Sequence, residues 1–366
     1  MTDAPYDAVL VLSFGGPEQP DDVLPFLRNV TRGRNVPDER LAEVAEQYAQ
    51  FGGRSPINDH CRALIAALDE ELRRAGLELP VYWGNRNWHP MLADTVATMT
   101  ADGVRRALVF ATSAFSSYSG CRQYREDLER TTDAVGSAAP ALQKLRLFYN
   151  HPGFVEPMAA NVAAAVGDAE ADIVSGAHRI VFTAHSIPVS MSTSCDYEPQ
   201  LHEAAQLVMD GAGLGHCEWD LVYQSRSGPP HIPWLEPDVN DHIEAIAAEG
   251  ATGVTLVPIG FVSDHMEVLF DLDTQAVATA EAAGIELRRA ATVGTDPRFI
   301  TMIRQLIEEQ VSAGPPLWLG QSGPWPDQCP EGHCLAPKRP AGAGRPAGAA
   351  RPGTSVTVSP GGTTTR

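Results

Sequence analysis

Short apolar runs rich in β-branched residues recur along the chain and alternate with amphipathic stretches of helical period. The runs cover residues 7–14, 81–85, 105–112, 179–184, 220–225, 253–260 and 285–290. Between them, residues 38–50 and 58–76 carry apolar side chains three and four positions apart, which is typical of a helix with one buried face. This alternation predicts an α/β fold with parallel sheets, and the nearly continuous apolar strands indicate sheets covered on both faces.

The predicted strand–helix units form two groups, three or four before residue 150 and three or four after it. We therefore expect two α/β lobes, residues 1–150 and 151–315, with a ligand cleft at the carboxyl ends of their strands. Residues 316–366 are rich in Pro, Gly, Ala and Thr, and from Pro337 on they offer little apolar surface. Such a composition predicts a largely disordered tail.

Charge and cysteine content narrow the class of protein. The net charge is −19, which disfavours a nucleic-acid partner. No run is long enough to span a bilayer, and the first residues are acidic where a signal peptide is basic. The cysteines of the predicted lobes are scattered singly, which fits reduced thiols and a cytoplasmic protein. They are Cys61, Cys121, Cys195 and Cys217.

Two strand ends carry residues suited to acid–base or metal chemistry. His185 ends the run before "SIP", at the edge of a sheet where ligands bind. The run 253–260 leads into "FVSDHMEVLFDLD", in which Asp264, Glu267 and Asp271 are spaced to line one helical face. Two interpretations stay open for these acids. They form a solvated face of a helix capped by Ser263 or Asp264, or they form a path for a cation.

Loops of the first lobe combine Arg, aromatic and small hydroxyl residues. They are "RGRNVP" (32–37), "FGGRSPIN" (51–58), "GNRNWHP" (84–90) and "ATSAFSSYSGCRQY" (111–124). Aromatic faces together with Arg and Ser suit a large flat ligand that bears carboxylates. The chain has neither G-x-G-x-x-G nor G-K-[ST], so a nucleotide-phosphate site is poorly supported.

Seven motifs in this order resemble those of the ferrochelatases, which insert Fe²⁺ into porphyrins. They are "SFGGP", "RGR-x-x-P", "GG-x-SPI", "WHP", "TAHSIP", "YQSR-x-GP…PWL-P" and "P-x-GF-x-SDH-x-E", over residues 6–312. The resemblance implies two Rossmann-like, chelatase-type lobes with the porphyrin in the cleft between them. It also implies that His185 is the catalytic histidine and Glu267 the acid opposite it, both able to bind the metal. Asp271 would extend this pair into a proton or cation path.

The resemblance further implies which residues contact the porphyrin. Tyr48, Ser55 and Tyr124 match positions that the family uses near the propionates, and Arg32 is a charged candidate. Phe14 stands where some bacterial relatives have a tyrosine that reaches the iron. Because phenylalanine cannot ligate a metal, we expect metal handling to rest on the histidine and glutamate named above.

The cysteines of the tail bear on the cofactor. Some members of the family hold a [2Fe–2S] cluster through one internal and three C-terminal cysteines. Here the tail offers Cys329 and Cys334, and the helix after residues 150–154 has no internal cysteine. The resemblance therefore implies an incomplete ligand set, no required cofactor, and Fe²⁺ as a substrate.

The composition and "SFGGPE" are similar to ferrochelatases of high-GC Gram-positive bacteria, which implies coproporphyrin III as the porphyrin. The expected partners are thus coproporphyrin III and ferrous iron, bound by a monomer that makes at most transient contacts with other haem-pathway enzymes. Three alternatives stay open. They are a ferrochelatase for protoporphyrin IX, a cobalt chelatase of the same fold, and a non-enzymatic haem or metal carrier.

Overall fold

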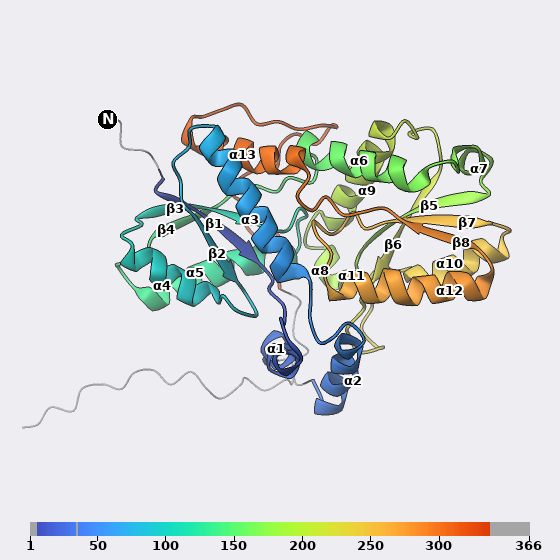
Figure 1. Cartoon of the computed structure of the whole chain (residues 1–366), viewed down its shortest axis with the longest axis horizontal. Helices are drawn as coiled ribbons and strands as arrows, with labels where there is room; N and C mark the ends of the chain where they lie inside the picture. Colours follow the sequence, from blue (N-terminus) through green and yellow to red (C-terminus); the bar gives the residue numbers. More distant parts are fainter. Residues whose placement is uncertain (1–5, 34–35, 337–366) are drawn as a thin grey trace, which may run out of the picture.

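The computed structural model describes residues 6–33 and 36–336, and within them the chain forms two four-stranded parallel sheets. The first sheet has the order β2-β1-β3-β4 and the second the order β6-β5-β7-β8. The strands of the first are β1 (Ala8–Ser13), β2 (Val81–Asn85), β3 (Arg106–Ala111) and β4 (Ala141–Lys144). Those of the second are β5 (His178–His185), β6 (Trp219–Gln224), β7 (Gly253–Val257) and β8 (Glu286–Arg289). The same strand order repeats in both sheets, so the expectation of two similar α/β lobes is confirmed (Figure 1).

Helices cover both sheets, as the apolar strands predict. Those up to residue 135 are α1 (Val23–Val30), α2 (Asp38–Ala49), α3 (Ile57–Arg74), α4 (Leu92–Ala101) and α5 (Gln123–Val135). The next are α6 (Pro152–Val166), α7 (Glu170–Ser175), α8 (Val189–Ser192) and α9 (Tyr197–Gly211). The last are α10 (Val239–Ala248), α11 (Met266–Phe270), α12 (Val277–Ala283) and α13 (Pro297–Val311). Shorter helical segments are η1 (Pro20–Asp22) and the π-helical η2 (Tyr118–Arg122) and η3 (Asp271–Ala276).

One strand, β4, was not predicted from the sequence pattern. All seven apolar runs form strands, but β4 is a four-residue edge strand of sequence ALQK, with no buried position. An edge strand contacts a single neighbour and can tolerate polar side chains, so it leaves no apolar run to recognise. The helices expected at 38–50 and 58–76 are present as α2 and α3.

A single core cluster joins the two lobes. Phe110 of β3 stacks on Phe148 at 5.3 Å between ring centroids, and Phe148 meets Phe299 of α13 at 5.8 Å. The same cluster includes Phe182 of β5 in the second sheet. Helix α13 follows the last strand of the second lobe yet packs against α3 of the first and α6 of the second (Figure 1). The two lobes are therefore held together by packed apolar contacts.

The first part of the expected tail lies against the lobes. The amide of Leu319 donates to the Asn150 carbonyl at 2.8 Å, and the Cys334 amide donates to the Ser194 carbonyl at 2.7 Å. Residues 316–336 thus follow a defined path without helix or strand, and the tail predicted over 337–366 falls outside the described residues. In the described ranges, no helix has the length and apolar composition needed to cross a membrane.

Candidate functional site

His185 and Glu267 face each other at the strand ends of the second lobe. The Nδ1 atom of His185 lies 2.5 Å from the Ser186 carbonyl oxygen. A carbonyl only accepts, so Nδ1 donates this hydrogen bond, and in the neutral ring the lone pair is then on Nε2. That Nε2 lies 3.6 Å from the Glu267 carboxylate oxygen Oε2. Two lone-pair atoms at this separation can share a proton or a metal ion.

Helix α11 presents Glu267, and its cap differs from the expectation. The helix begins at Met266, and His265 in an extended conformation is the capping residue. The ring Nδ1 of His265 accepts a hydrogen bond from the Glu267 amide at 3.1 Å. The prediction of a cap at Ser263 or Asp264 was therefore wrong, because an imidazole two residues before the amide satisfies it.

Asp271 is the first residue of η3 and is held at the edge of the second sheet. Its carboxylate accepts from the Ser225 hydroxyl and, at 3.3 Å, from the Gln224 amide. Burial, together with the nearby negative charge of Glu267, raises the pKa of Asp271 to about 6. Because this pKa lies near neutrality, Asp271 can gain and lose a proton at ordinary pH.

The acidic residues around α11 divide into two sets. Arg289 of β8 binds Asp264 at 3.2 Å and Asp273 at 2.5 Å. The expectation that Asp264, Glu267 and Asp271 line one helical face was thus wrong, because Asp264 precedes the helix and pairs with an arginine from another strand. Glu267 and Asp271 remain as the acids beside His185.

Phe26, Tyr48 and Trp88 of the first lobe form an aromatic wall close to Glu267. Tyr48 of α2 is buried, and its pKa is raised by that burial and by the charge of Glu267, which places both side chains in one neighbourhood. The ring of Phe26 lies 6.2 Å from both the Tyr48 and the Trp88 rings. Met266 of α11 packs into the same apolar cluster. Phe26 and Tyr48 therefore form part of a packed apolar cluster close to Glu267.

Phe14 follows β1 at the rim of this wall and remains 37% exposed, with its ring 6.3 Å from that of Phe26. The Arg86 guanidinium lies 6.0 Å from the Phe14 ring and 4.5 Å from the Tyr124 ring. Tyr124 itself is only 4% exposed and packs in the core of the first lobe. The structure therefore places Arg86, which the sequence did not single out, close to both the Phe14 and the Tyr124 rings.

The other two residues expected near the porphyrin, Ser55 and Arg32, differ in their exposure to solvent. Ser55 is buried, where its side chain leaves no room for a Cβ on Gly16. Arg32 is exposed just beyond the end of α1. Of the residues expected near the porphyrin, Tyr48 is therefore part of the aromatic wall and Phe14 lies at its rim. Phe26 belongs to the same wall, although no sequence pattern indicated it.

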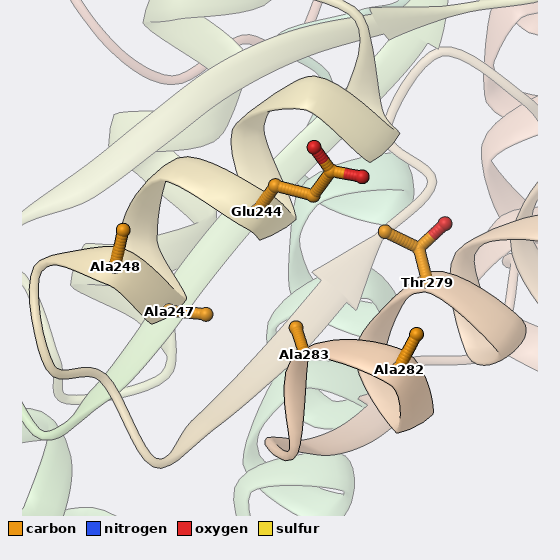
Figure 2. A pocket seen from close by; sticks show the side chains of 6 residues that line it. All are labelled: Glu244, Ala247, Ala248, Thr279, Ala282 and Ala283. Carbon is orange, nitrogen blue, oxygen red and sulfur yellow. The ribbon is translucent and has the colours of Figure 1, made fainter.

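Two surface hollows lie in the second lobe. One of about 390 Å³ lies between α10 and α12 and is lined by alanines with Glu244 and Thr279 (Figure 2). The other, of about 480 Å³, is lined in part by Ser186, Tyr223 and Arg226 and so adjoins the residue that follows His185. The first has no group suited to acid–base or metal chemistry beyond one carboxylate, whereas the second borders the proposed site.

The two α/β lobes have the same strand order and form a chelatase-type fold, and the imidazole–carboxylate pair lies at the strand ends of the second lobe. The family model described as Ferrochelatase matches residues 6–311. The chain belongs to the ferrochelatase family, and porphyrin and iron are therefore its substrates. In the part of the chain that the structure describes, no three His, Cys, Asp or Glu side chains converge to hold one metal ion.

The chain is similar to curated proteins over nearly its whole length. It is 52% identical over 365 residues to a coproporphyrin III ferrochelatase of Streptomyces griseus, covering 93% of this chain and 96% of that protein. It is 54% identical over 345 residues to one of Frankia alni, covering 91% and 87%. A protein of Rhodopirellula baltica named ferrochelatase is 52% identical over 343 residues, covering 93% and 97%. Among solved structures, SirB of Bacillus subtilis with Fe³⁺ matches with a TM-score of 0.49 and 9% identity, covering 84% of this chain and 96% of SirB.

Proposed function

We propose that the protein inserts Fe²⁺ into coproporphyrin III, with His185 and Glu267 at the reacting centre. The observation that carries the catalytic part is the pair itself, in which the imidazole Nε2 of His185 lies 3.6 Å from a carboxylate oxygen of Glu267. Support for this porphyrin comes from the relatives of Streptomyces griseus and Frankia alni, which are named for it.

The reaction needs two things that this pair supplies. Insertion exchanges Fe²⁺ for two pyrrole protons, so a base must accept protons while the ion loses its waters. In the neutral ring of His185 the Nδ1–H donates to a carbonyl, so the lone pair is on Nε2, which can accept a proton or bind the ion. Glu267 can balance the charge of a protonated imidazole, and imidazole nitrogen with carboxylate oxygen is a ligand pair that suits Fe²⁺.

Asp271 can receive the proton after the His185–Glu267 pair. It adjoins Glu267 and has a pKa of about 6, so it can take a proton from the pair and release it to solvent at neutral pH. The tilt or bending of the macrocycle that exposes its nitrogen lone pairs would draw on binding to the exposed Phe14 ring, against which the buried Phe26 ring packs. A passive haem or metal carrier has no need of a proton-accepting residue beside such a pair.

The remaining assignments rest on the sequence and on the free thiols. We propose a cytoplasmic monomer, since all six cysteines are unpaired, as in a reducing compartment. Iron enters as a substrate, and catalysis by the pair described above requires no cofactor. A preference for protoporphyrin IX, or for cobalt as the metal, is the competing assignment.

Competition kinetics test the porphyrin. Coproporphyrin III carries four propionates, whereas protoporphyrin IX has vinyls in place of two. Each charge-assisted hydrogen bond to a carboxylate contributes about 1.5–3 kcal/mol, so two lost bonds predict a discrimination of about a hundredfold or more. With both porphyrins and Fe²⁺ in one anaerobic cuvette, we expect coproporphyrin III to be consumed first. Equal consumption, or a preference for the vinyl porphyrin, would overturn the substrate while leaving the chelatase chemistry intact.

A further inference from the structure

Two asparagines of the first lobe, Asn58 and Asn85, are buried although each carries a polar amide. Asn58 lies in the first turn of α3 and is 1% exposed, and Asn85 ends β2 and is fully buried. The Asn85 amide nitrogen donates to the side-chain oxygen of Asn58 at 3.3 Å. Two loops adjoin this pair, namely the β1 loop (residues 14–18) and the β2 loop (residues 86–90). A buried amide is stable only when its hydrogen bonds are made, so its partners show what it holds in place.

The Asn58 side chain joins the two loops to each other. Its amide nitrogen donates to the Gly16 carbonyl at 3.2 Å and to the Glu18 carboxylate at 2.8 Å, both in the β1 loop. The same nitrogen donates to the His89 carbonyl at 3.2 Å, in the β2 loop. A carboxylate in place of this amide would face these acceptors without a donor, and an apolar side chain would leave them unpaired. The position therefore requires an NH₂ group.

The Asn85 side chain supports the same two loops from the end of the strand. Its amide nitrogen also donates to the His89 carbonyl at 3.1 Å, and its oxygen accepts from the Trp83 indole N–H at 3.0 Å. Gly15 lies directly against it, because a Cβ on Gly15 would come within 2.8 Å of the Asn85 Cβ. Gly15 also has a φ of 80°, which glycine adopts without strain. The β1 loop therefore rests on the Asn85 side chain at the residue that follows Phe14.

Both loops carry aromatic residues beside the proposed porphyrin site. Phe14 opens the β1 loop and is exposed, and Trp88 of the β2 loop belongs to the aromatic wall. Each of these rings packs against Phe26, at 6.3 Å and 6.2 Å between centroids. The Asn87 amide also donates to the Phe14 carbonyl at 3.0 Å, so the two loops are joined through their backbones as well. A shift of either loop would therefore displace the Phe14 ring.

Side chains of two helices tie the loops to the rest of the first lobe. Arg62 of α3 pairs with the Glu18 carboxylate, which Asn58 also contacts. Asn29 of α1 donates to the Asn87 carbonyl at 2.8 Å. Hydrogen bonds are directional, so these contacts fix where the loops lie as well as holding them to the lobe.

We infer that Asn58 and Asn85 are positioning residues for porphyrin binding, which hold the β1 loop, the β2 loop and the start of α3 as one preformed support for the Phe14 ring. The inference rests on the proposed function, in which Phe14 contacts the macrocycle. Both asparagines are buried, so they act through that ring and do not touch the ligand. A ligand that binds a preformed support need not order the loops, and that ordering would otherwise weaken binding. The pair therefore governs the affinity for the porphyrin rather than the chemistry at His185.

Steady-state kinetics of the full chain with Fe²⁺ and coproporphyrin III test the inference. In Asn58→Ala and Asn85→Ala, the KM for the porphyrin and its Kd from fluorescence titration should rise about tenfold. The kcat and the KM for Fe²⁺ should stay within about twofold of the wild-type values, whereas a merely structural role would lower kcat with the folded fraction and leave the porphyrin KM unchanged. The matched control is Asn161→Ala, which should change neither constant, since this amide also donates to backbone carbonyls, at 2.9 Å and 3.1 Å, but in the second lobe.

Phe14→Ala completes a double-mutant cycle with Asn58→Ala. Removal of the ring should by itself weaken porphyrin binding. In that background, Asn58→Ala should change the Kd by less than about twofold, because the ring that the amide positions is gone. If Asn58→Ala fails to fold, Asn58→Ser takes its place in the cycle, and because serine keeps one donor it should raise the Kd by a smaller factor.

Three outcomes overturn the inference. An unchanged porphyrin KM in both asparagine variants, together with weak binding by Phe14→Ala, refutes the positioning role and leaves the proposed porphyrin contact standing. A full effect of about tenfold from Asn58→Ala in the Phe14→Ala background shows that the amide acts elsewhere. Unchanged porphyrin binding by Phe14→Ala removes the proposed contact and the inference with it. None of these results bears on the His185–Glu267 pair, whose role is measured through the rate of insertion.

Discussion

Replacing Asp271 by asparagine should stabilise the protein at alkaline pH. The carboxyl is largely buried, and burial raises its pKa from an ordinary 3.8 to about 6. A raised pKa means that the folded state disfavours the charged form. Stability is therefore greatest below the unfolded pKa and falls as the pH rises toward the folded pKa.

The size of the effect follows from the two pKa values. At 1.36 kcal/mol per pKa unit, the ionised Asp271 costs the folded state about 3 kcal/mol at pH 8 and about 1 kcal/mol at pH 4.5. Asparagine removes this cost and can still accept from the Ser225 hydroxyl, but its NH₂ group opposes the Gln224 amide, which reduces the gain. The gain from Asp271→Asn should thus be about 2 kcal/mol larger at pH 8 than at pH 4.5.

Urea unfolding of the wild type and of Asp271→Asn at the two pH values measures this difference. Iron insertion by the variant should fall at the same time, since asparagine cannot relay a proton. An equal change in the free energy of unfolding at both pH values would show that burial does not perturb Asp271. A variant that is less stable than the wild type at pH 8 would refute the reasoning altogether.

Three further predictions follow from specific contacts. Glu267→Gln should bind porphyrin as the wild type does and lose insertion activity by about a hundredfold, as measured by steady-state kinetics, because an amide neither takes up a proton nor balances charge. Arg289→Gln leaves the carboxylates of Asp264 and Asp273 without their partner, so it should lower the free energy of unfolding by about 1–3 kcal/mol at pH 7 and by less at pH 4. The control Arg298→Gln, at a more exposed pair, should lower the free energy of unfolding by less than about 1 kcal/mol. Arg146→Met breaks a buried bidentate pair with Glu309 and should cost about 3–5 kcal/mol by denaturant unfolding, and a loss under 1 kcal/mol would contradict that account.

The fold was largely readable from the sequence because buried parallel strands are long apolar runs. The exception, β4, is an exposed edge strand whose residues Gln143 and Lys144 need no apolar partner. Its place beside β3 depends on contacts between distant segments, which no local pattern records.

The site was readable only where a local motif marked it. His185 and Glu267 stand at strand and helix ends that the pattern already indicated, and the structure brings them together. Arg289 lies in a strand whose sequence gives no sign that it neutralises Asp264.

Iron insertion by His185→Ala tests the central claim most directly. Porphyrin binding, followed by fluorescence titration, should change little because the aromatic wall remains, whereas the anaerobic rate of Fe²⁺ insertion into coproporphyrin III should fall by at least about a hundredfold. The control is His216→Ala, an exposed histidine before β6 and thus at the opposite end of the strands from the site, which should insert iron at the wild-type rate. A His185→Ala variant that binds porphyrin and keeps most of the wild-type insertion rate would contradict the role assigned to the His185–Glu267 pair.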